Sequence, residues 1–233
     1  MCTQVARHGR SEAFLSEEQF TDGPLRGLAH VLDKDSHSKA ENQLDTAEVA
    51  RILAVGKELL PASYQLLLQY LRSTGQPWWD CENLPYPEGA VLLPPRAKQP
   101  PEFKLDGRTF SCRKSHPGNS AIQFKRPGDN LIVTGFIEVI WEIPLQEQMR
   151  TFCVVDLHSV PPPFILQQLP FTMRPHLNTA VVDAQPSRTV CIIKPRHILT
   201  HLTVYKRPKG TFGIDRDILT ICSSLNRGWR TGD

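Results

Sequence analysis

The stretch from residue 103 to residue 143 constrains the fold of this chain more than any other. Short runs of β-branched and aromatic residues alternate there with the turn dipeptides Asp106-Gly107 and Pro127-Gly128. Asp-Gly is a strong hairpin dipeptide, because both positions of a tight two-residue turn need positive φ angles. Pro-Gly also favours a turn, since proline fixes φ at one position and glycine tolerates the next. We therefore expect consecutive antiparallel strands in this stretch.

A long strand is predicted for residues 131–143. Gly135 interrupts it, and we expect a bulge or bend at that glycine. Side chains alternate between the two faces of a strand. The prediction therefore places Ile137, Val139, Trp141 and Ile143 on one face and Glu138, Ile140 and Glu142 on the other.

Further strands are predicted from β-branched and apolar runs at residues 152–155, 179–182, 189–193 and 198–205. About seven short strands with closely spaced turns indicate an antiparallel β barrel or sandwich. We expect this β domain to span residues 102–206. Residues 207–233 are interpreted as a basic C-terminal tail, in which only 218–221 forms an apolar run.

A helical hairpin is predicted for residues 45–75. Asp45 is suited to cap the first helix, with Glu48 at capping-box spacing, and apolar residues continue to Leu60. Pro61 ends that helix and suits the first turn of a second one, which Gly75 closes. The apolar stripe of the second helix is Tyr64, Leu67, Leu68 and Leu71. It is interpreted as a packing surface, with a partner-binding groove as the alternative. The fold class is therefore α+β.

The remaining segments are polar or rich in proline. Residues 1–44 are interpreted as a partly disordered segment in which Asp22 and Pro24 start a short helix ending near Leu32. Residues 76–101 form a proline-rich connector with Trp78-Trp79 and Tyr86 interleaved. These aromatics either pin the connector to the β domain, which we favour, or present it to a proline-reading module.

Composition excludes several classes of protein. No apolar run approaches the ~20 residues that cross a membrane, and residues 1–10 have no apolar core of the kind that a secretory signal needs. The six cysteines are scattered, and no N-glycosylation sequon occurs. We therefore expect free thiols and an intracellular location, the nucleus included.

No catalytic residue, metal site or cofactor is predicted. His197 and His201 have a zinc-protease spacing, but no Glu follows His197, and on a strand the two rings would stand ~13 Å apart. Gly56-Lys57 lacks the other residues of a phosphate loop and is expected inside a helix. Gly118-Asn119-Ser120 lacks the second glycine of a nucleophile elbow and is interpreted as a turn with left-handed Gly and Asn.

Positive charge is concentrated at the end of the chain. The net charge is +3, and residues 188–233 carry nine Lys and Arg against three Asp and Glu. Lys206, Arg207 and Lys209 are expected together on a turn, with Tyr205 and Phe212 on either side. Cations beside aromatic rings can hold a nucleic-acid backbone and stack on bases. We therefore predict nucleic acid, or an acidic protein surface, as the partner. A solvated basic face is the alternative.

Four short motifs resemble a known group of proteins. They are Leu93-Pro-Pro-x-Ala97, Phe103-x-Leu-x-Gly-x-x-Phe110-Ser, Gly118-Asn-Ser-x-Ile-x-Phe124 and Gly135-x-Ile-x-x-Ile140. The arrangement resembles uncharacterised proteins of mushroom-forming fungi that are encoded in or beside large DNA transposons of the Kyakuja–Dileera–Zisupton type, over about residues 60–205. The acidic motifs of the transposases have no counterpart here. The resemblance therefore implies an accessory region, a tail region or a degenerate fragment, and not a catalytic core.

The leading hypothesis is a non-enzymatic interaction module, related to transposons, that contacts nucleic acid or a protein partner. The second is an enzyme whose dispersed His, Cys and acidic residues converge only in the fold. The third is a structural remnant without activity.

Overall fold

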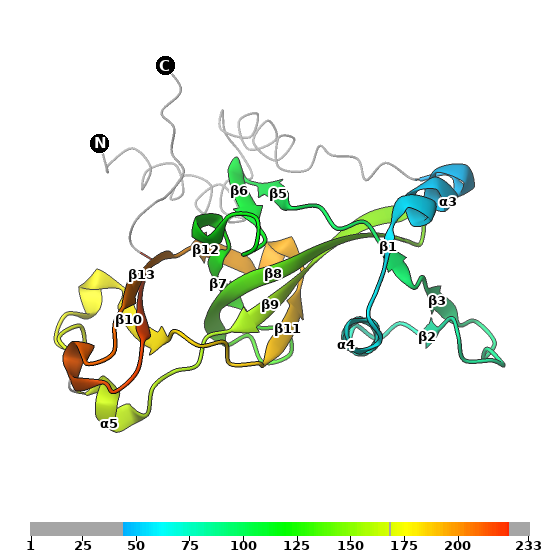
Figure 1. The fold of residues 1–233 in the computed structure, drawn as a ribbon. Coiled ribbons are helices and arrows are strands. Elements are labelled where there is room, and N and C mark those ends of the chain that lie inside the picture. Colours follow the sequence, from blue (N-terminus) through cyan, green and yellow to red (C-terminus); the bar gives the residue numbers. More distant parts are fainter. Residues whose placement is uncertain (1–43, 168, 224–233) are drawn as a thin grey trace, which may run out of the picture. The chain divides into compact units, whose positions relative to one another are not determined.

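A computed structural model describes residues 44–167 and 169–223, and it shows a mixed α+β chain built mostly of strands (Figure 1). The larger sheet has five antiparallel strands in the order β11-β9-β8-β7-β12. Its strands are β7 (Ala121–Lys125), β8 (Ile132–Leu145), β9 (Gln148–Leu157), β11 (Val190–Ile193) and β12 (Ile198–His201). The α+β class and the antiparallel pairing are confirmed. Closure into a barrel is not shown, because β11 and β12 are the two edges of this sheet within the described residues.

The smaller sheet has three antiparallel strands in the order β10-β14-β13. They are β10 (Thr179–Asp183), β13 (Thr203–Arg207) and β14 (Ile218–Cys222). The central strand, β14, contains the apolar run of the segment interpreted from the sequence as a tail. Residues 207–222 therefore contribute to the β structure.

The single strand predicted for residues 198–205 is wrong. The chain leaves the larger sheet after His201 and joins the smaller one at Thr203. Leu202, between them, is buried, and its amide donates to the carbonyl of Ala121 at 2.8 Å. The burial of Leu202 fixes the chain where it passes from one sheet to the other, so one apolar run forms strands of two sheets. A hydrophobic cluster joins the sheets at this corner: Ala121, Phe136, Val182, Leu202, Leu219 and Ile221.

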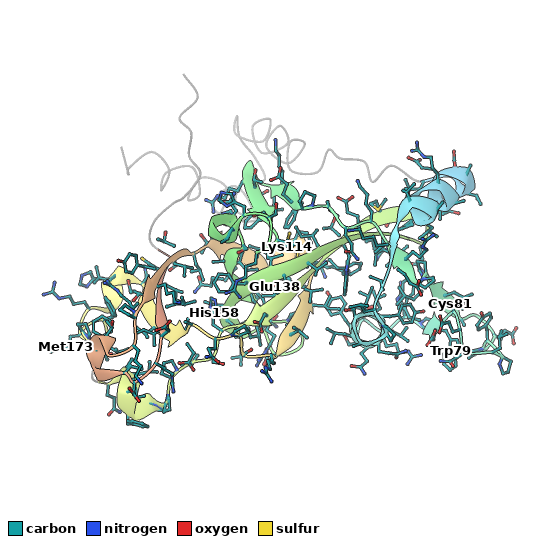
Figure 2. The ribbon with its side chains drawn as sticks, viewed as in Figure 1. Trp79, Cys81, Lys114, Glu138, His158 and Met173 are labelled. Atoms are coloured by element: carbon teal, nitrogen blue, oxygen red, sulfur yellow. The ribbon has the colours of Figure 1, made fainter. Side chains whose placement is uncertain are left out.

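The bulge of β8 lies three residues beyond the predicted position. The register against β9 shifts between Ile137 and Val139, and Gly135 itself remains in regular pairing. The extra residue, Glu138, reverses the alternation. As a result Ile137 and Ile140 enter the same hydrophobic cluster, although alternation predicted opposite faces for them. Glu138 is labelled in Figure 2, and its Oε1 lies 3.4 Å from Arg113 Nη1.

Helix α3 (Thr46–Val55) begins where predicted, because the amide of Glu48 donates to Asp45 Oδ1 at 2.7 Å. It ends earlier than predicted. Lys57–Glu58 form strand β1, which pairs with β4 (Arg96–Ala97), so Gly56-Lys57 does not lie inside a helix. A short apolar run is compatible with either a helix or a strand, so the sequence up to Leu60 does not show where the helix ends.

Helix α4 (Pro61–Arg72) buries its predicted stripe, Tyr64, Leu67, Leu68 and Leu71. The packing interpretation is confirmed. These side chains share a cluster with Trp141 of β8 and Phe152 of β9. The helix therefore packs on the long β8–β9 ribbon seen in Figure 1.

The connector contributes two short parallel strands, β2 (Trp78–Asp80) and β3 (Val91–Leu93). Trp78 is buried in the same cluster as Trp141, so the expectation that connector aromatics pin it to the β structure is confirmed for this residue. Tyr86 is exposed, but its hydroxyl donates to the carbonyl of Cys81.

The hairpin at Asp106-Gly107 is confirmed. It joins β5 (Glu102–Leu105) to β6 (Arg108–Ser111), with φ angles of 49° and 71° at the two turn residues. The left-handed turn predicted at Gly118-Asn119 is wrong, because both lie in the short 3-10 helix η2 (Pro117–Asn119). His116 caps this helix through Nδ1, which accepts from the amide of Asn119 at 3.2 Å.

The other short helices are α5 (Pro163–Leu166), η3 (Pro175–Leu177), η4 (Pro195–His197) and η5 (Thr211–Gly213). None of the described helices is long and apolar enough to cross a membrane. The predictions for residues 1–43, including the short helix from Asp22, and those for residues 224–233 lie outside the described residues.

Candidate nucleic-acid interface

The three predicted site residues lie at the end of β13 and in the loop that follows it. Lys206 and Arg207 are the last two residues of the strand, and only Lys209 lies in the turn. Because neighbouring strand residues point to opposite faces, Lys206 and Arg207 do not share a face. The expectation that all three cations stand together on one turn is therefore wrong.

Arg207 shares its face of β13 with Tyr205. Its guanidinium carbon lies 4.3 Å from the centre of the tyrosine ring, in a cation–π contact. The Tyr205 side chain is 59% exposed. Phe212, the second aromatic residue of the prediction, packs instead edge-on against Phe171, with ring centres 5.7 Å apart. Tyr205 is thus the ring of this pair that remains open to a stacking partner.

Lys206 and Lys209 meet carboxylates. Lys206 Nζ lies 2.9 Å from Asp217 Oδ2, and Lys209 Nζ lies 2.9 Å from Asp215 Oδ1. The amide of Lys209 donates to Asp217 Oδ1 at 3.0 Å. The hydrogen bond from Lys206, followed by that from the Lys209 amide, holds the pKa of Asp217 below its ordinary value. Both lysine side chains are nevertheless about two-thirds exposed, at 68% and 65%.

A polar pocket of about 310 Å³ adjoins these pairs and is lined in part by Asp217. Arg216, also in the lining, donates through Nε to Asp183 Oδ1 of β10. Ser159, Gln185 and Pro186 complete the lining. Sequence reasoning missed Arg216 and Asp183, because only the pairing of β10 with β14 brings them together.

We call this group the charged corner. It consists of Lys206, Arg207, Lys209, Arg216, Asp183, Asp215 and Asp217. Its four cations exceed its three carboxylates by one charge, whereas the basic residues of 188–233 exceed the acidic ones by six. The lysine and arginine heads keep N–H groups beyond those that the aspartates accept, because an ammonium has three donors and a guanidinium five.

The two histidines of the zinc-protease spacing do not face a common site. His197 lies in η4, where its Nδ1 accepts from the amide of Lys194 at 3.2 Å. His201 is buried and stacks on Phe110, with ring centres 3.9 Å apart. Within residues 44–167 and 169–223, no group of three or more His, Cys, Asp or Glu side chains is arranged to hold a metal ion.

The cysteines of the described part, Cys81, Cys112, Cys153, Cys191 and Cys222, are free thiols. Burial raises the pKa of Cys153 to about 12, which keeps that thiol protonated and unreactive.

No family model, no curated protein and no solved structure matches the chain. The likeness to the transposon-associated fungal proteins therefore rests on the four motifs alone.

Proposed function

We propose that the chain is a non-enzymatic interaction module that binds the phosphate backbone of single-stranded nucleic acid at the charged corner. The observation that carries this proposal is the exposed Tyr205 ring with Arg207 against it on one face of β13, together with the exposed ammonium of Lys206 on the other face and that of Lys209 in the turn that follows. An aromatic platform next to cations is the usual arrangement for holding a strand without strong sequence preference.

The ion pairs of the corner set the expected strength of binding. Asp215 and Asp217 compete with phosphate for the two lysines, so binding is weak and falls steeply with salt. Dissociation constants of roughly 10⁻⁴ to 10⁻⁶ M are typical of such non-specific contacts at physiological salt.

The resemblance of residues 60–205 to transposon-associated proteins supports the same function. An accessory protein of a DNA transposon would meet nucleic acid inside the cell, the nucleus included. The proposal therefore assigns this chain a transposon-related accessory role, with an acidic protein surface as the competing partner.

The decisive experiment measures fluorescence anisotropy of a short labelled single-stranded DNA, and of the matching RNA, at roughly 50 and 200 mM salt. The variant Lys206→Glu, Arg207→Glu, Lys209→Glu should abolish binding. A matched variant, Lys57→Glu, Lys104→Glu, Lys114→Glu, makes the same change in net charge at three exposed lysines outside the corner and should retain most of it.

Equal losses in the two variants would reject the site, since only net charge would then matter. Unchanged binding by the corner variant would reject it as well. Binding of a polyglutamate peptide in place of DNA, lost in the corner variant alone, would assign the corner to an acidic protein. Thermal melts of all variants establish that each is folded.

A further inference from the structure

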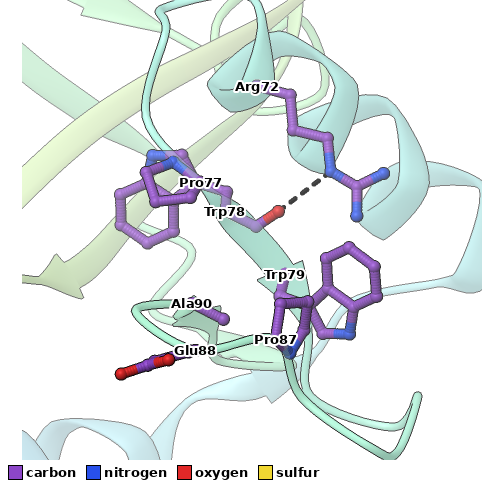
Figure 3. Close-up of a pocket in the computed structure, with 7 residues that line it drawn as sticks. All are labelled: Arg72, Pro77, Trp78, Trp79, Pro87, Glu88 and Ala90. Atoms are coloured by element: carbon purple, nitrogen blue, oxygen red, sulfur yellow. Dashed lines mark hydrogen bonds between the residues drawn. The ribbon is translucent and has the colours of Figure 1, made fainter.

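The connector carries a second pocket, of about 300 Å³, which is separate in sequence from the charged corner (Figure 3). Its walls are apolar and come from Pro77, Trp78, Trp79, Pro87 and Ala90. Two charged side chains, Arg72 and Glu88, complete the lining, and Figure 3 shows them on opposite sides of it. The pocket is therefore an apolar slot with one cationic and one anionic end.

Strand alternation turns the two tryptophan rings of β2 away from each other. Trp78 and Trp79 are neighbours in β2, so their rings point to opposite faces. Trp78 is buried in the main core, whereas Trp79 stays partly exposed. Trp79 Nε1 donates to the carbonyl of Asn83 at 3.0 Å, which fixes the ring. A ring held in this way provides a rigid flat wall.

Arg72, at the end of α4, is held at two points. Its Nε donates to the carbonyl of Trp78 at 2.9 Å, and its guanidinium carbon lies 5.2 Å from the centre of the Trp79 ring. Among the residues described, no carboxylate pairs with it. The two Nη groups are therefore left for a ligand, in the planar fork that matches a carboxylate.

The chemistry of the slot distinguishes between ligands. An extended peptide would need donors for its carbonyl groups. Trp79 Nε1 is already used, and Pro77 and Pro87 have no amide hydrogen. A ligand with one anionic acceptor group and a flat apolar body needs none of these donors. Glu88 repels an anion at the far end, and this orients the ligand toward Arg72.

We propose that this pocket binds a flat aromatic monocarboxylate, with its ring against Trp79 and the proline walls and its carboxylate on the Nη groups of Arg72. The volume is at the lower end of the roughly 300–1,000 Å³ typical of small-molecule sites. A body of one or two fused rings therefore suits it. This site does not depend on nucleic-acid binding at the charged corner.

The test is isothermal titration calorimetry of the full chain with 2-naphthoate and, in parallel, with uncharged 2-naphthamide. The carboxylate should bind about tenfold or more tightly than the amide, because charged hydrogen bonds to arginine exceed neutral ones. Arg72→Gln should weaken 2-naphthoate by about the same factor and weaken 2-naphthamide much less, because the amide loses only a neutral hydrogen bond. Glu88→Gln should leave 2-naphthoate binding equal or tighter.

Arg96→Gln is the matched control. Arg96 is another exposed arginine that donates to a backbone carbonyl, that of Ala54, and it does not line the pocket. Its replacement should change neither affinity. The proposal is overturned if 2-naphthoate does not bind, if it binds no better than 2-naphthamide, or if Arg72→Gln and Arg96→Gln weaken it equally. Should Arg72→Gln fail to fold, the comparison of the two ligands on the unmodified protein still decides the matter.

Discussion

Gly135 of β8 lies so close to Asp156 of β9 that a Cβ atom on Gly135 would stand 2.5 Å from the Asp156 carbonyl oxygen. The same atom would stand 2.6 Å from Val155 Cγ1. Because β8 is held between β7 and β9, neither backbone can withdraw freely. We predict that Gly135→Ala lowers the free energy of unfolding by about 3 kcal/mol, measured by urea denaturation.

Gly89→Ala is the control for this prediction. Gly89 has a φ of +75°, but a Cβ there meets no atom within 4 Å. Its replacement should cost only about 1 kcal/mol, through backbone strain alone. Equal losses of unfolding free energy at the two glycines would show that the close approach to Asp156 does not destabilise the Gly135→Ala variant.

His158 makes the stability of the fold dependent on pH. Its Nδ1 lies 3.0 Å from Thr134 Oγ1, and its ring meets Phe136 edge-on at 4.7 Å. Burial, followed by the charge of Arg113, lowers the pKa of His158 to about 4. Between pH 6.5 and 4, His158 is protonated in the unfolded chain and neutral in the folded chain. Stability is therefore complete above pH 6.5 and falls on acidification, by about 1.4 kcal/mol per pH unit.

The measurement is urea denaturation at a series of pH values from 7.5 to 4, on the natural chain and on His158→Gln. In the variant, the slope of the unfolding free energy against pH should fall by the equivalent of about one bound proton in this pH range. The pKa of His197 is also lowered, first by burial and then by the charges of Arg196 and Lys194. Some dependence of stability on pH therefore remains in the variant. An identical slope in both proteins would show that His158 does not contribute.

The hydroxyl of Tyr64 connects α4 to the connector. It donates to the carbonyl of Leu93 at 2.8 Å and accepts from the amide of Cys81 at 3.2 Å. Tyr64→Phe should therefore lower the free energy of unfolding by about 1–2 kcal/mol, because two backbone groups lose their partner. Tyr70→Phe, in a ring that packs edge-on against Phe152, should cost less in the same thermal and urea melts. A larger cost for Tyr70→Phe would contradict this account.

Asp217 limits the positive charge of the charged corner, since it accepts from both Lys206 and Lys209. If the corner binds phosphate, Asp217→Asn should strengthen binding of single-stranded DNA by about three- to tenfold and steepen its salt dependence. Asp129→Asn, which removes an equal charge beside Arg126, is the control and should change little. Anisotropy titrations at two salt concentrations compare them, and an equal gain in both would count against a local site.

Elements with a local cause were predictable. Asp106-Gly107 forms its hairpin because the turn needs two positive φ angles, whatever lies around it. Asp45 caps α3 because its carboxylate reaches an amide three residues away. The stripe of α4 is buried because its period matches the helix.

The errors share a different cause. The sequence does not predict β14 as a central strand, since an apolar run does not indicate which strands it pairs with. The bulge at Glu138 is a shift in the register of β8 against β9, and no residue of β8 indicates its position in the sequence. The pattern predicts the three basic residues together, but strand alternation separates Lys206 from Arg207, and Asp215 and Asp217, just beyond the next turn, pair with the lysines.

The sequence alone thus determined where the chain turns, where its helices begin and which side chains avoid water, because those choices depend on backbone φ angles and on periods of a few residues. Only the tertiary structure decided which strands pair, which cations meet carboxylates and where a pocket opens between Arg72 and Glu88. Those outcomes depend on distances between residues of different elements, and the packing and register of the elements set these distances.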